Sequence, residues 1–178
     1  MGNDIVKILN AAAFAARKHS TQRRKDRAAS PYINHPLALA AVLAGEGGVI
    51  DADVITAALL HDTVEDTDTT LAELEAHFGA QVAAIVAEVT DDKALPKAER
   101  KRLQVIKAPG KSAQAKLVKL ADKICNLRDI ASDPPSDWSA ERKSAYFAWA
   151  NDVVAGLRGT NPALEAAFDA AFAAGHGG

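Results

Sequence analysis

The amino-acid sequence predicts an all-α protein, folded as a single bundle of about eight helices. Apolar residues recur at the spacing of one helix face along almost the whole chain, and no convincing alternation of apolar and polar residues indicates a strand. Proline and glycine punctuate this pattern where the predicted helices begin and end. With 178 residues, 48% of them hydrophobic, and a net charge of −2, the chain has the composition of one folded domain over 1–178.

Local signals set the bounds of each predicted helix. His35 is expected to cap the second helix, with Pro36 as its first residue, and Asp51 to cap the third. Thr70 and Glu73 fit a capping box, in which each side chain reaches the backbone N–H of the other residue. The pattern predicts helices over 4–18, 36–45, 71–79, 80–90, 96–107, 112–131 and 136–159, and a last helix from 162 onward. The helix that Asp51 caps is predicted to continue to residue 60.

Three segments between or after these helices are expected to lack regular structure. Residues 19–34 are polar and basic and are predicted to form a loop. Pro134 and Pro135 break the chain after the longest helical pattern, because proline lacks a backbone N–H. The terminal segment AAGHGG, residues 173–178, is expected to fray.

Composition excludes several classes of protein. Charged residues interrupt every apolar stretch well before the ~18 residues that a membrane-spanning helix needs. The first residues lack the pattern of a secretory signal, and one cysteine, Cys125, cannot form an internal disulfide. A pI near 6.2 argues against a protein that coats nucleic acid. The expectation is a cytoplasmic protein with neither a membrane nor a nucleic-acid partner.

Four side chains offer the imidazole and carboxylate groups that bind divalent metals: His35, His61, Asp62 and Asp122. His61 and Asp62 follow the apolar segment 57–60, where burying a carboxylate is costly unless a cation pairs with it. Such a set would leave open positions on a six-coordinate ion for water and substrate oxygens. From spacing alone, a capping histidine, a core histidine and two ion-paired aspartates are the simpler interpretation.

Glu65 and Asp66 lie about one helical turn beyond His61 and Asp62. A carboxylate at that distance can orient and deprotonate a water held by a metal ion. The alternative is a solvated helix end, although a negative charge is mildly unfavourable at a helix C-terminus.

Basic residues form two clusters that suit phosphate groups, although two solvated faces are the simpler interpretation. The clusters contain Arg23, Arg24, Lys25 and Arg27, and Lys93, Lys97, Arg100, Lys101 and Arg102. Tyr32, Tyr146 and Trp149 could stack on a nucleobase, but the helical spacing of Trp149 favours a core position. Cys125 is expected to be a small buried hydrophobic residue.

Taken together, these residues resemble a known family. The order His35, His61–Asp62, Asp122 is similar to the H…HD…D signature of the HD metal-dependent phosphohydrolases. Longer segments resemble the hydrolase domain of RelA/SpoT homologues, above all the stand-alone small alarmone hydrolases of the metazoan type, over about residues 4–170. The matching segments are QRRKD, PYINHP, AALLHDTVEDTDTT, FGAQV, EVTDDK, KLVKLADKICNLRDI and YFAWANDVVAGLRGTNPALE.

The resemblance implies an Mn²⁺-dependent enzyme with one ion. It would remove the 3′-pyrophosphate of the alarmone (p)ppGpp and give GDP or GTP plus pyrophosphate. By position, the metal ligands would be His35, His61, Asp62 and Asp122, and Glu65 and Asp66 would position and activate the attacking water. The implied substrate contacts are Arg24, Lys25, Lys97, Asn126, Arg142 and Tyr146. Three departures from the family pattern, at 26–30, 109–115 and Cys125, concern base contacts and local packing.

Other functions remain open at this stage. A related HD-type enzyme would share the metal site and act on another 3′- or 2′-phosphorylated nucleotide, such as NADPH. A degenerate HD domain would only bind nucleotide and regulate a partner, but it is expected to lack a ligand or the pair Glu65–Asp66. A purely structural helical module would be indifferent to metal. The sequence leaves the oligomeric state open.

Overall fold

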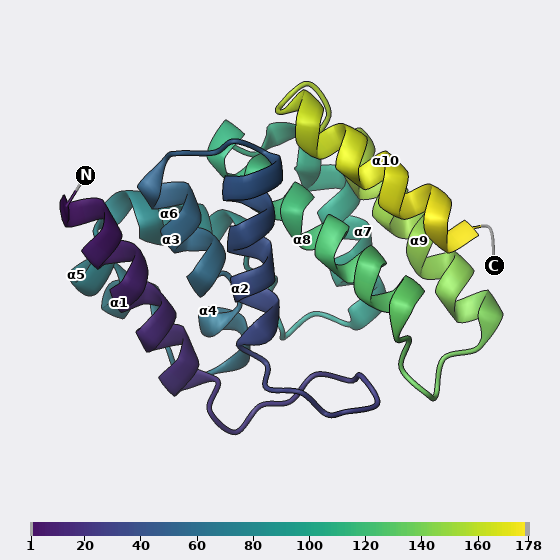
Figure 1. Ribbon diagram of the computed structural model, residues 1–178, viewed down its shortest axis with the longest axis horizontal. Helices are drawn as coiled ribbons and strands as arrows, with labels where there is room; N and C mark the ends of the chain where they lie inside the picture. Colours follow the sequence, from purple (N-terminus) through teal and green to yellow (C-terminus); the bar gives the residue numbers. More distant parts are fainter. Residues whose placement is uncertain (1, 177–178) are drawn as a thin grey trace.

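The computed structural model describes residues 2–176, and helices make up most of this range (Figure 1). Within it, the only β pairing is an isolated bridge between Arg23 and Pro31. The all-α prediction is therefore confirmed. The helices are α1 (Gly2–Lys18), α2 (Asn34–Ala41), α3 (Ala52–Leu60), α4 (Thr63–Asp66), α5 (Leu71–Phe78), α6 (Ala80–Val89), α7 (Lys97–Lys107), α8 (Ala113–Ser132), α9 (Ala140–Ala155) and α10 (Pro162–His176), with a π-helical turn at Val42–Glu46 and a 3₁₀ turn at Ala108–Gly110.

Two helices, α3 and α8, form the centre of the bundle. Every residue of α3 from Val54 to Leu60 is buried, as its uniformly apolar sequence requires. In α8, the fully buried side chains include Leu120, Ile124 and Leu127. Each such side chain stabilises the fold by about 1.5–3 kcal/mol relative to an exposed one. The helix that precedes His61 and the helix that carries Asp122 are thus both held in place by buried side chains.

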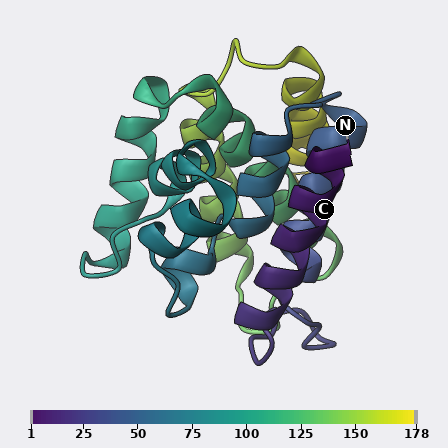
Figure 2. The same cartoon turned by 90° about the vertical axis from the view of Figure 1, so that its left-hand side faces the viewer.

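The other helices surround this centre. Helix α1 packs on α3, and α5 packs on α6, at one end of the molecule. At the other end α10 lies along α8 and α9 (Figure 1). The view in Figure 2 places α1 on the near side, with α7 at the edge away from it. None of the described helices has the length and apolar character needed to cross a membrane.

The prediction that His35 caps α2 was wrong. The backbone N–H groups of Asn34 and His35 donate to Pro31 O and Tyr32 O, so helical turns begin before the proline. Helix α2 starts at Asn34, and His35 is a buried residue inside it. A histidine that was expected at the rim of a helix therefore faces the interior.

Two other predicted caps are present. An Asp51 carboxylate oxygen accepts the Asp53 N–H (2.9 Å), and Thr70 Oγ1 accepts the Glu73 N–H (3.1 Å). The Glu73 carboxylate lies 3.2 Å from Lys18 Nζ, so it links α5 to α1. This contact across the bundle replaces the second half of the predicted capping box.

The last helix extends further than its composition predicts. Residues 173–176 belong to α10, while residues 177–178 lie outside the described range. Gly175 packs so closely on Phe147 of α9 that an added Cβ would lie 2.0 Å from its ring. Close packing on α9 accounts for helix where fraying was expected.

Candidate metal and nucleotide site

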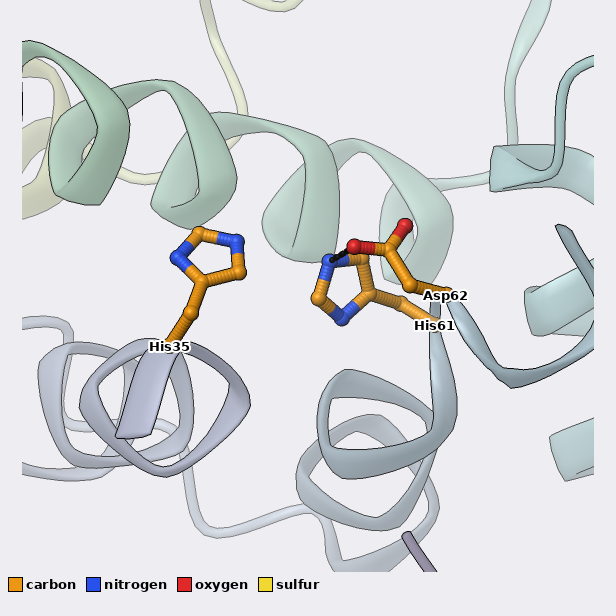
Figure 3. A group of neighbouring side chains, drawn as sticks. All are labelled: His35, His61 and Asp62. Atoms are coloured by element: carbon orange, nitrogen blue, oxygen red, sulfur yellow. Dashed lines mark ion pairs between the residues drawn. The ribbon is translucent and has the colours of Figure 1, made fainter. Parts of the chain in front are cut away.

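Three predicted metal ligands come together where α2, α3 and α4 meet. His35 lies in the first turn of α2, His61 directly follows α3, and Asp62 directly precedes α4. One ligand atom from each of these residues lies within 4.8 Å of the other two. Figure 3 shows His35 on one side and His61 with Asp62 on the other, all beneath α8. The fold thus gathers residues that are 26 positions apart in the sequence.

The two nitrogens of the buried His61 ring have different surroundings. Nδ1 lies 2.8 Å from Ala58 O and must donate, because a carbonyl oxygen only accepts. Nε2 has no hydrogen-bond partner and lies 2.9 Å from Asp62 Oδ2. If the His61 ring were neutral, the lone pair of Nε2 would face a lone pair of Asp62 Oδ2. The geometry therefore requires a cation between them, either a proton or a metal ion.

Asp122, on α8, is joined to this cluster through His35. Its Oδ1 lies 3.2 Å from His35 Nε2 and accepts a hydrogen bond from Asn126 Nδ2 (2.6 Å). Its Oδ2 accepts from the buried Lys123 Nζ (3.1 Å). Burial alone would raise the pKa of Asp122, but Lys123 and His35 hold it well below its usual range. Asp122 is therefore an ionised carboxylate that fixes the orientation of the His35 ring.

The donor set fits a divalent transition metal. His61 Nε2 is a buried nitrogen without a hydrogen-bond partner, and leaving such an atom unpaired is costly. Two imidazoles with neighbouring carboxylates are the usual ligands of Mn, Fe and Zn. The His61 ring is also held at its other nitrogen by Ala58 O, as ligating histidines normally are.

A cleft of about 630 Å³ opens beside His35. Its volume lies in the range of small-molecule sites. Of the predicted functional residues, six line it: Arg24, Lys25, His35, Asp66, Asn126 and Tyr146. The structure thus places four of the six predicted substrate contacts around one cavity next to the candidate metal ligands.

Lys97 and Arg142 are not among the residues that line this cleft. Arg142 stacks its guanidinium 4.5 Å from the centre of the Trp138 ring and lies 3.2 Å from Asp137. Lys97 is the first residue of α7 and is exposed. Both lie at the α7–α9 side of the bundle rather than in the cleft wall.

Two further lysines connect that side to the metal cluster. The Lys101 and Lys123 ammonium groups lie 4.4 and 4.3 Å from the centre of the Trp149 ring. Burial lowers the pKa of Lys101, and so do the nearby charges of Lys97, Lys123 and Arg142. The sequence analysis did not single out Lys123, although its position directly after Asp122 was a usable signal. These four cations form a positive region suited to phosphate groups.

The pair Glu65–Asp66 lies on α4, a four-residue helix that apolar periodicity did not indicate. Glu65 accepts the Asp91 N–H (3.2 Å) and lies 3.3 Å from Arg100. Burial raises the pKa of Glu65, so this carboxylate binds a proton more readily than an exposed one. Asp66 accepts from Gln22 (3.0 Å) and Lys93, and it faces the cleft.

Cys125 belongs to the hydrophobic core, and Trp149 packs against it. Cys125 is buried, as predicted, and burial raises the pKa of its thiol to about 12. It is therefore a neutral, hydrophobic side chain. Trp149 is half-buried against the core and donates its indole N–H to Lys101 O (3.1 Å).

An all-α bundle with two buried histidines and two aspartates beside a cleft lined by Arg24 and Lys25 has the features of a metal-dependent phosphohydrolase. The comparison with known families agrees with this class. The chain belongs to the HD domain family, whose model matches residues 11–151. The resemblance stated from the sequence is confirmed.

Within the HD domain family, the chain is similar to a smaller group of proteins. The human guanosine-3′,5′-bis(diphosphate) 3′-pyrophosphohydrolase MESH1 is 61% identical over 94% of this chain and 93% of its own length. The Drosophila melanogaster protein of the same name is 49% identical over 93% of each chain. A solved structure described as a metazoan ortholog of SpoT that hydrolyses ppGpp superimposes with a TM-score of 0.91, at 48% identity over 94% of both chains.

Longer bacterial proteins match only in part. An Aquifex aeolicus guanosine-3′,5′-bis(diphosphate) 3′-pyrophosphohydrolase is 41% identical over 69% of this chain, which corresponds to 18% of that relative. The chain is thus similar along nearly its full length to the short relatives and to one segment of the long ones.

Proposed function

We propose that this protein is a Mn²⁺-dependent hydrolase that removes the 3′-pyrophosphate of ppGpp and pppGpp. The observation that carries the proposal is the cluster of His35, His61 and Asp62, with both histidines buried, beside a cleft that Arg24 and Lys25 line, in a chain similar over nearly its full length to ppGpp hydrolases. We expect the enzyme to act on a free nucleotide in the cytoplasm, without a nucleic-acid partner.

Each part of the site has a role in this reaction. Water attacks the phosphorus next to the 3′ oxygen, the bond between them breaks, and GDP or GTP leaves together with pyrophosphate. A divalent ion held by His35, His61, Asp62 and Asp122 would polarise a phosphoryl oxygen and lower the pKa of the attacking water. Glu65, whose pKa is raised by burial, would accept the proton, and Asp66 would orient the water.

The remaining residues bind the substrate. Arg24, Lys25, Asn126 and Tyr146 line the cleft and would hold the nucleoside and its nearer phosphates. Lys97 and Arg142, with Lys101 and Lys123, would oppose the charge of the outer phosphates from the other side. Positioning and charge stabilisation of this kind account for most catalysis of phosphoryl transfer.

The proposal is tested with metal-stripped protein, incubated with ppGpp in the presence and absence of Mn²⁺. Products are resolved by anion exchange. GDP and pyrophosphate that appear only with Mn²⁺ would support the reaction, the bond cleaved and the cofactor together. Stoichiometric Mn²⁺ binding without turnover would contradict ppGpp as substrate, and a nucleotide panel that begins with NADPH would then identify the alternative.

Metal affinity is expected to rise with pH. Burial alone would lower the pKa of His61, but Asp62 raises it from 6.5 to about 9 in the metal-free protein. At pH 7 a metal ion must therefore displace about one proton, so affinity should rise by about tenfold per pH unit up to pH 9. The proton itself stabilises the metal-free fold fully below pH 6.5, and this contribution is lost as the pH passes through about 9.

Calorimetry at pH 7 in buffers of different protonation enthalpy measures the proton count directly. About one proton released per Mn²⁺ is the expected result. Binding whose heat is independent of the buffer would show that His61 is already neutral and contradict this prediction.

A further inference from the structure

Tyr32 lies between the candidate metal cluster and the loop that carries the basic residues. It is half-buried at the end of the segment 19–34, just before α2. Its hydroxyl donates to Asp62 Oδ2, the carboxylate oxygen that also lies 2.9 Å from His61 Nε2. No other described side chain forms a hydrogen bond to the Asp62 carboxylate from outside the cluster. Tyr32 therefore controls the position of the oxygen that faces His61.

The Tyr32 ring makes a second set of contacts. Its centre lies 4.7 Å from that of His19 and 6.0 Å from that of His35. The Arg24 guanidinium lies 6.0 Å from the same ring centre, while it pairs with Asp129 on α8. One aromatic side chain thus contacts a candidate metal ligand through its hydroxyl and a candidate nucleotide contact through its face.

We propose that Tyr32 is a positioning residue that orients Asp62 toward the metal ion and holds Arg24 at the nucleotide cleft. Only the part of this inference that concerns Arg24 and the nucleotide rests on the proposed function. Outer partners of metal ligands typically contribute 10–100-fold to metal affinity, since they fix the ligand before the ion arrives. A hydroxyl and a ring face on one side chain allow the two contributions to be separated by substitution.

The test compares Tyr32→Phe with the unchanged protein. Phenylalanine retains the ring against His19, His35 and Arg24 and removes only the hydroxyl on Asp62. We expect Mn²⁺ affinity, measured without nucleotide by electron paramagnetic resonance, to fall by about tenfold. At saturating Mn²⁺ the KM for ppGpp should be unchanged. Mn²⁺ affinity equal to that of the unchanged protein would overturn the proposal.

Two matched variants separate the hydroxyl from the ring. Tyr146→Phe removes the hydroxyl of the other tyrosine, a residue that also lines the cleft, and should leave Mn²⁺ affinity unchanged. Tyr32→Leu removes both functions, so it should lower Mn²⁺ affinity as Tyr32→Phe does and also raise the KM a few-fold through loss of the Arg24 contact. A Tyr32→Leu protein with the KM of Tyr32→Phe would refute the link to Arg24.

The metal measurement does not depend on the identity of the substrate. If ppGpp proved not to be the substrate, the difference in Mn²⁺ affinity between Tyr32→Phe and Tyr146→Phe would still test the role of the hydroxyl. Failure of the proposed function and failure of this inference are therefore distinguishable.

Discussion

Replacing His61 by alanine is expected to abolish Mn²⁺ binding and ppGpp hydrolysis together. His61 Nε2 is buried, has no hydrogen-bond partner and faces both Asp62 and His35, so the remaining ligands cannot close the cluster without it. Loss of ~4 kcal/mol of charge stabilisation from the ion corresponds to a fall in turnover of about 10³-fold. Mn²⁺ titration and the ppGpp assay on the same preparation measure both effects.

His77→Ala is the matched control. His77 lies on α5, where its ring packs against Phe14 and Phe78, away from the cleft. The His77→Ala protein should bind Mn²⁺ and turn over ppGpp as the unchanged protein does. Normal Mn²⁺ binding by His61→Ala would contradict the assignment of this cluster as the metal site.

Asp122→Ala is expected to lose metal and activity as well, but it also affects stability. Removal of the carboxylate leaves the buried Lys123 without its ion-pair partner, and such a loss typically costs about 3–5 kcal/mol. Asp122→Asn retains the side-chain shape and is the variant to compare. A folded Asp122→Asn protein with unchanged Mn²⁺ affinity would show that Asp122 only orients His35.

Much of the fold follows from local rules, because those rules act over a few residues. The apolar run before His61 predicts a buried helix, and α3 is buried over that run. The caps at Asp51 and Thr70 need only a side chain and a backbone N–H two or three residues later. By contrast, α2 begins before Pro36 because turns that start at Pro31 and Tyr32 supply its first hydrogen bonds, and the apolar periodicity that located the other helices does not extend over these turns.

The candidate site is less predictable, since its contacts join distant segments. Four ligands could be named from residue type and from a family resemblance, but the link between Tyr32 and Asp62 spans the α2–α3 segment. The pairing of Arg24 with Asp129 crosses more than 100 positions. Lys97 and Arg142 were expected beside the same substrate as Arg24, but the fold leaves them out of the wall of the cleft that Arg24 lines. Their roles remain predictions.

Glu65→Gln is expected to retain Mn²⁺ and lose most turnover. Glu65 is not one of the three residues whose ligand atoms cluster, and it is held outside them by the Asp91 N–H and Arg100. Glutamine has nearly the same shape and can still accept the Asp91 N–H, but it cannot take up a proton. Loss of a general base lowers turnover by about 10²–10⁴-fold. Glu65→Ala should behave in the same way, with Arg100 left unpaired.

The two readouts together identify the role of this carboxylate. Mn²⁺ affinity should equal that of the unchanged protein, whereas His61→Ala loses it, so the two variants separate proton transfer from metal binding. Glu73→Gln, which changes a carboxylate of α5 that pairs with Lys18 of α1, controls for loss of one negative charge. If Glu65→Gln hydrolysed ppGpp at the normal rate, Asp66 would become the remaining candidate for the proton acceptor, since it faces the cleft from the same short helix.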